Sequence, residues 1–164
     1  MFATHPASAL TAQDKALFSG LRTADYDPIY RFTVRLTKEG AGREMDVDTG
    51  IEGSIRLIRL GTFDLPEMGQ LAVWKIRSYA GGIFVPFRDA TAGVSGGSYG
   101  AGRYLLDTIK GAYHGVRGSG ADAEFVLDFN FAYNPSCAYN EEWASPLPGP
   151  SNRLAVEIPV GELF

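Results

Sequence analysis

Residues 30–37 of the chain read YRFTVRLT. Apolar or aromatic side chains occupy the even-numbered positions, and arginines and threonines occupy the odd-numbered ones. Because successive side chains of a strand point to opposite faces, this alternation predicts a strand with one buried and one wet face. Further short stretches with strand character are 54–60, 70–77, 83–87, 103–108, 124–130 and 153–159.

Turn residues separate these stretches. The chain of 164 residues contains 20 glycines and 9 prolines, and no strand–helix alternation is visible. We therefore expect a mainly β protein, built as a single antiparallel β-barrel or a two-layer β-sandwich. Thr11 and Asp14 have the spacing of a capping box, which predicts one short N-terminal helix at about 12–19. The expected domain is single, 1–164, with a lead-in and helix in 1–22 and a β core in 28–164.

Composition narrows the possible partners. The net charge is −4, whereas a nucleic-acid binder needs a basic face, so we expect no nucleic acid. We expect no membrane partner either, because there is no polybasic cluster and no apolar run of about 20 residues. The N-terminus lacks the features of a signal peptide, and Cys137 is the single cysteine. Together these observations predict a cytoplasmic location.

Several stretches together resemble one family. They are SALTAQDKALFSGL (8–21), FVPFRDATAG (84–93), SYGAGRYL (98–105), LDFNFAYNPSCAYN (127–140) and PLPGPSNRLAVEIPVGE (146–162). This chain resembles the DUF1684 family of bacteria and archaea. No activity is established for that family, so the resemblance implies none for this chain. The positions that it marks as characteristic are Phe87, Asp89, Thr91, Gly93, Tyr99, Gly100, Gly102, Arg103, Tyr104, Asp128, Asn130, Tyr133, Asn134, Pro135, Cys137, Tyr139, Asn152, Arg153, Gly161 and Glu162.

Two positions depart from that resemblance. Ser98 stands where relatives often have threonine, which keeps the hydroxyl group. Ser145 stands where relatives often have a second cysteine, so a cysteine pair is not essential to this member.

Polar and aromatic residues gather in the second half of the chain. Asp128 and Asn130 are two apart in a predicted strand and should share a face. Asp89 and Arg103 flank a glycine-rich loop and could pair. Two interpretations stay open: a buried network that ties loops to the β core, or a ligand pocket. The residues predicted to bind the ligand are Asp89, Tyr99, Arg103, Tyr104, Asp128, Asn130, Tyr133 and Asn134.

The sequence gives little support for a metal site, a phosphate-binding loop or a reactive cysteine. His5 and His114 lack zinc-ligand spacing, and the carboxylates do not have the spacing of a calcium loop, so we predict no metal site. The glycines of 96–102 follow neither phosphate-loop pattern and are expected to serve a tight turn. Cys137 has no base close in sequence and is read as a packed small residue.

Three functional hypotheses follow. The first is binding of a small molecule in a polar and aromatic pocket beside the β core. The second is a hydrolase or lyase, with Asp89 or Asp128 as general acid or base and Arg103 stabilising an anion. The third is a structural or interaction module. The sequence names no cofactor and no oligomeric state, and it does not decide whether the protein is an enzyme.

Overall fold

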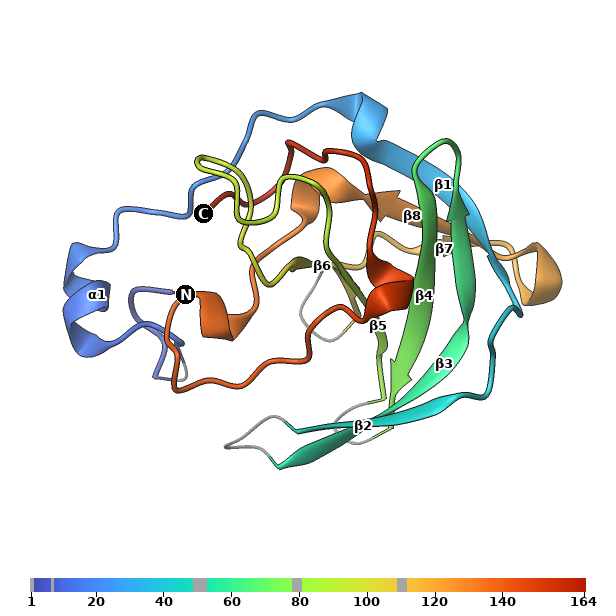
Figure 1. The fold of residues 1–164 in the computed structure, drawn as a ribbon, viewed down its shortest axis with the longest axis horizontal. Coiled ribbons are helices and arrows are strands. Elements are labelled where there is room, and N and C mark those ends of the chain that lie inside the picture. The colour runs from blue at the N-terminus through green and yellow to red at the C-terminus, as the bar shows by residue number, and fades with distance from the viewer. Residues whose placement is uncertain (1, 7, 49–52, 78–80, 109–111) are drawn as a thin grey trace.

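The computed structural model describes residues 2–6, 8–48, 53–77, 81–108 and 112–164. Within them, eight strands form one antiparallel sheet that curls into a half-barrel (Figure 1). A mainly β fold with one short helix, α1 (Ala12–Leu17), is thereby confirmed. The strands are β1 (Arg31–Thr37), β2 (Glu44–Asp48), β3 (Ser54–Leu65), β4 (Gly69–Ile76), β5 (Ile83–Phe87), β6 (Arg103–Asp107), β7 (Val116–Arg117) and β8 (Glu124–Asp128). No helix in these ranges is long and apolar enough to cross a membrane.

The sheet is arranged around β3. Its order is β6-β5-β4-β3-β1-β8-β7, and β2 also pairs with β3. One side of β3 pairs with β4, while the other pairs first with β2 and then, near its end, with β1. The change of partner coincides with a bulge at Gly61, where a Cβ atom would lie 1.8 Å from the carbonyl oxygen of Thr37. Bulges increase local bending, which allows the sheet to curl here.

Apolar side chains cover both faces of the central strands. On β4, Leu71 and Val73 belong to the main core inside the curl, whereas Ala72 and Trp74 belong to a second cluster. Because successive side chains alternate, the second cluster lies on the outer face. Its buried members are Leu57, Ala72, Trp74, Ile76, Phe84 and Tyr104. Aromatic contacts inside the curl join elements that are not adjacent in the sheet: β3 and β8 through Phe63 and Phe125, and β5 and the turn after β8 through Phe87 and Phe129.

The strand predicted at 153–159 is wrong. This part belongs to an extended C-terminal segment (residues 153–164) that makes single backbone hydrogen bonds with 88–90: Leu154 N to Arg88 O, and Ala90 N to Val156 O. Leu154 and Ile158 are nevertheless buried, with the alternation that a strand would show. An extended segment has the same side-chain period as a strand, so the pattern could not distinguish the two.

Proline cannot donate to a strand ladder and is typical of edge strands or strand ends. Pro86 lies near the end of β5, which is an interior strand between β4 and β6. A register shift between Val85 and Pro86 accommodates the missing N–H group. Among the described residues, β4 pairs with β5 through Ile83 and Phe84. Beyond them, the Asn152 side-chain amide donates to Ala72 O at 2.8 Å and to Pro86 O at 2.7 Å. The buried amide of Asn152 thus joins the two strands where their own ladder ends.

Candidate functional site

Arg103 is fully buried at the start of β6. Its Nη2 donates to Asp89 Oδ1 at 3.1 Å and to Ile158 O at 2.8 Å. Its Nη1 donates to Val160 O at 2.5 Å and to Glu162 O at 3.2 Å. Its Nε has no hydrogen-bond partner among the described residues. Burial lowers the pKa of the guanidinium, and the Asp89 carboxylate opposes that shift. Arg103 therefore holds the C-terminal segment against the sheet.

The Asp89 carboxylate completes this network. Its Oδ2 accepts hydrogen bonds from Thr91 N at 3.1 Å, Thr91 Oγ1 at 2.6 Å and Ile158 N at 2.9 Å. Ser98 Oγ lies 3.4 Å from Oδ1 and 2.9 Å from the Thr91 hydroxyl. Position 98, where the sequence retains a hydroxyl, thus belongs to the same network. Asp89 thus accepts hydrogen bonds from two backbone N–H groups, a hydroxyl group and an arginine.

Asp128 and Asn130 lie in a different cluster. Asn130 is part of a 3-10 turn (Phe129–Phe131), not of β8, and Asp128 caps that turn by accepting from Asn130 N. The predicted shared strand face is therefore wrong, although Asn130 Nδ2 does reach Asp128 Oδ1 at 2.9 Å. Asp128 also accepts from Tyr26 and pairs with Arg31 at 3.5 Å. Asn130 exchanges hydrogen bonds with the backbone of Asp27. Together they attach residues 26–27, which precede β1, to the end of β8.

Tyr104 and Tyr133 pack edge to face, with ring centroids 5.5 Å apart. Tyr133 donates to Asp107 Oδ2 at 3.0 Å, and Tyr104 donates to Pro146 O at 2.9 Å. Burial is the main cause that raises the pKa of both phenols, so both stay protonated at neutral pH. The Tyr104 and Tyr133 backbones also exchange two hydrogen bonds, which cover the edge of β6.

The last predicted residues lie near the end of the chain. Asn134 N donates to Glu162 Oε2 at 2.9 Å, and the Tyr139 hydroxyl donates to Glu162 Oε1. Burial raises the pKa of Glu162, against these donors. Tyr99 lies over Cys137, with its hydroxyl 3.4 Å from Cys137 O, and burial raises the pKa of Tyr99 to about 12.

The eight predicted ligand residues thus fall into several hydrogen-bonded groups. Asp89 and Arg103 form one, Asp128 and Asn130 another, and the remaining four lie around the C-terminal part of the chain. Each group makes hydrogen bonds to loops or to the C-terminal segment of the protein. Whether any of them binds a ligand or acts in a reaction stays a prediction.

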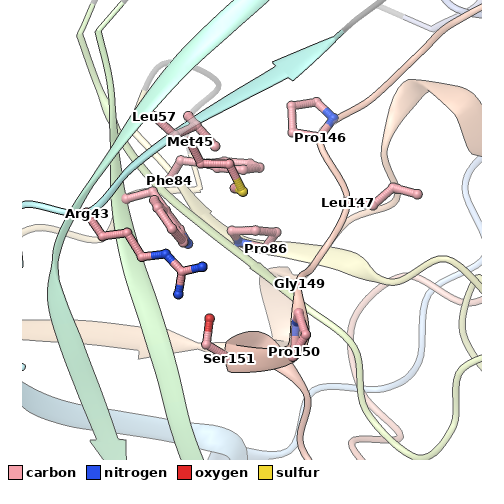
Figure 2. A pocket seen from close by; sticks show the side chains of 11 residues that line it. Arg43, Met45, Leu57, Phe84, Pro86, Pro146, Leu147, Gly149, Pro150 and Ser151 are labelled. Atoms are coloured by element: carbon pink, nitrogen blue, oxygen red, sulfur yellow. The ribbon is translucent and has the colours of Figure 1, made fainter. Parts of the chain in front are cut away.

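A groove opens instead on the outer face, beside the second apolar cluster. It has a volume of about 190 Å³ and lies between the sheet and residues 146–151 (Figure 2). Its lining residues are Arg43, Met45, Leu57, Trp74, Phe84, Pro86, Pro146, Leu147, Gly149, Pro150 and Ser151. Trp74 and Phe84 are register partners on the adjacent strands β4 and β5, so their side chains lie side by side on the outer face. We call this site the groove.

The proline-rich wall of the groove is fixed at several points. Tyr104 holds Pro146 through the hydroxyl contact described above. Pro148 is buried against Gly102, whose φ is +102°; a Cβ atom there would lie 2.8 Å from Pro148 Cγ. Asn152 follows the wall directly and is tied to β4 and β5. The groove therefore has two anchored sides.

Sequence reasoning missed the groove. Its lining residues come from β2 to β5 and from a distant proline-rich stretch, and none of them is among the eight predicted ligand residues. The one available signal was PLPGP at 146–150, a stiff segment that needs a surface to lie on. Nothing in its local sequence indicates which face of the sheet it covers.

Comparison with known proteins identifies relatives but no activity. The model of the family described as "Protein of unknown function (DUF1684)" matches residues 16–163. The solution NMR structure of the uncharacterised protein from gene locus rrnAC0354 of Haloarcula marismortui is similar, with a TM-score of 0.71 and 32% identity. The alignment covers 98% of this chain and 85% of that chain. No curated protein matches. The family match and the shared fold agree with the motifs around Asp89, Arg103 and Asp128: the chain belongs to the DUF1684 family.

Proposed function

We propose that this protein binds a small, largely apolar molecule in the groove. The observation that carries the proposal is a groove of about 190 Å³ with a mostly aromatic, aliphatic and prolyl lining. An apolar cavity of about 150 Å³ accommodates benzene. The groove therefore has room for one ring with a short side chain.

The anchored walls support this proposal. One wall is a hydrogen-bonded sheet, and the other is a proline-rich segment held by Tyr104, Gly102 and Asn152. A binding site whose walls are already ordered loses little conformational entropy when a ligand enters. The flat faces of Trp74 and Phe84 suit an aromatic or planar ligand.

In this proposal Tyr104 supports the walls of the groove and does not line it. Its ring packs on Phe84, with centroids 4.7 Å apart, and its hydroxyl holds Pro146. The described residues that line the groove include no carboxylate, imidazole or thiol group. The proposal is therefore limited to binding, without a reaction.

NMR titration with hydrocinnamamide, a neutral single-ring probe, tests the proposal. The chain has two tryptophans, Trp74 and Trp143, and a Trp143→Phe variant assigns their indole N–H signals. We expect a saturable shift of the Trp74 signal at millimolar probe concentration or below, while the Trp143 signal stays in place.

A matched pair of variants locates the binding. Met45 lines the groove, whereas Val47, on the same face of β2, does not. Met45→Tyr should fill the groove and weaken binding at least several-fold, and Val47→Tyr should leave binding unchanged. Equal binding by both variants, or no shift of the Trp74 signal, would show that the groove is not the site.

A further inference from the structure

The groove has a charged residue at its rim. Arg43 precedes β2 and already pairs with β3, because Arg59 N donates to Arg43 O at 2.8 Å. Side chains alternate along this stretch. Arg43 therefore lies on the groove face with Met45, and the acidic residues of β2 lie on the opposite face: Glu44, Asp46 and Asp48.

The guanidinium of Arg43 is not used by the fold. Among the described residues that line the groove it is the one charged group. It makes no hydrogen bond or ion pair with any part of the chain that the structure describes. By contrast, Arg35, Arg56 and Arg103 each pair with a carboxylate. Figure 2 shows the Arg43 guanidinium, just before β2, projecting toward Ser151.

This arrangement combines an apolar body site with a cationic end. A guanidinium presents parallel N–H donors whose geometry matches a carboxylate. Beside apolar walls such a pair is less screened than in open water. We infer that the ligand of the groove is a small single-ring carboxylate, whose ring packs against Trp74 and Phe84 and whose carboxylate binds Arg43. The inference rests on the proposed function and names the chemical class of its ligand.

A charge-matched pair of probes tests the inference separately from the proposed function. Hydrocinnamate has the same ring and chain as hydrocinnamamide but carries a carboxylate. In the NMR titration of the Trp74 signal, we expect hydrocinnamate to bind about 3- to 10-fold more tightly than the amide. That ratio should shrink as sodium chloride is raised, because salt screens a pair at the rim.

Two variants assign the effect to one side chain. Arg43→Gln should bring the ratio of hydrocinnamate to hydrocinnamamide affinity to about 1, mainly by weakening the binding of hydrocinnamate. Lys75→Gln removes the same charge from an exposed position of β4, beside Trp74 but on the other face, and should retain the ratio.

The outcomes separate the two proposals. If both probes bind equally to the wild-type protein, or if Arg43→Gln keeps the ratio, the carboxylate inference is overturned while the proposed binding function stands. If neither probe shifts the Trp74 signal, the proposed function fails and the inference fails with it.

Discussion

The two faces of the sheet use arginine in opposite ways. Inside the curl, Arg103 is fully buried, and its side chain makes four hydrogen bonds to Asp89 and to carbonyl groups of the C-terminal segment. On the outer face, Arg43 is exposed at the rim of the groove and has no side-chain partner within the described ranges. A buried charge with full partners contributes to the architecture. An unpaired charge beside an apolar groove can still bind another molecule.

The largest expected effect is a loss of stability when the buried Arg103 network is broken. Arg103→Met removes the donor to three carbonyl groups and leaves Asp89 without its charge partner. We expect the free energy of unfolding to fall by about 3–5 kcal/mol, measured by urea denaturation. Arg35→Met breaks an exposed pair with Glu124 and should cost at most about 1 kcal/mol. Equal losses in the two variants would mean that the Arg103 network does not stabilise the fold.

The second prediction concerns Asn152, which joins the two sides. Asn152→Ala leaves the carbonyl groups of Ala72 and Pro86 without their side-chain donor. We expect unfolding to become easier by about 2–3 kcal/mol, because each lost bond leaves a buried acceptor unpaired. Hydrocinnamamide should also bind more weakly, because the groove wall loses its attachment. Ser151→Ala changes the neighbouring exposed residue and should alter stability by no more than about 0.5 kcal/mol. Unchanged stability of Asn152→Ala would contradict the role given to this amide.

The smallest expected effect is the pH dependence that Glu162 introduces. Burial raises its pKa above the ordinary value of 4.5, so the folded state binds this proton more tightly than the unfolded state does. The resulting stabilisation is fully present below pH 4.5 and is lost as the pH rises through the raised pKa. Urea denaturation at several pH values should therefore show wild type losing stability relative to Glu162→Gln over that range.

A second variant tests the direction of the pKa shift of Glu162. The Tyr139 hydroxyl donates to Glu162 and lowers its pKa. Tyr139→Phe should therefore raise the pKa of Glu162 further and extend the loss of stability to higher pH. Parallel stability curves for wild type and Glu162→Gln would show that Glu162 titrates alike in the folded and unfolded states.

Local patterns predicted β1, β3 to β6 and β8 near their observed positions. The alternation in 30–37 corresponds to β1, where Val34 is buried and Phe32 and Leu36 are half-buried. That pattern depends only on neighbouring side chains, so one sequence is sufficient to read it. The pairing of Asp89 with Arg103 could also be anticipated, because both flank one loop. The carbonyl groups at 158–162 that accept from Arg103 could not be anticipated. Every residue has a backbone carbonyl group, so the residue types do not indicate which ones bind the arginine.

Tertiary contacts account for what the sequence did not reveal. Pro86 lies in an interior strand because a register shift and the amide of Asn152 replace the missing ladder contacts. Asn130 leaves the strand because Asp128 caps a turn there. The groove forms only when a proline-rich segment returns to β2 and β3. Each of these outcomes depends on residues far away in the chain, which local periodicity does not encode.

The arrangement around Arg103 has a consequence for biosynthesis. β5 and β6 are complete by residue 107, but Ile158, Val160 and Glu162 supply the acceptors for the Arg103 side chain. A ribosome must therefore translate about fifty more codons and release this stretch from its exit tunnel before the guanidinium can be enclosed. Until then Arg103 can pair with Asp89 but lacks its three carbonyl acceptors, so native closure of this protein is a late event in its synthesis.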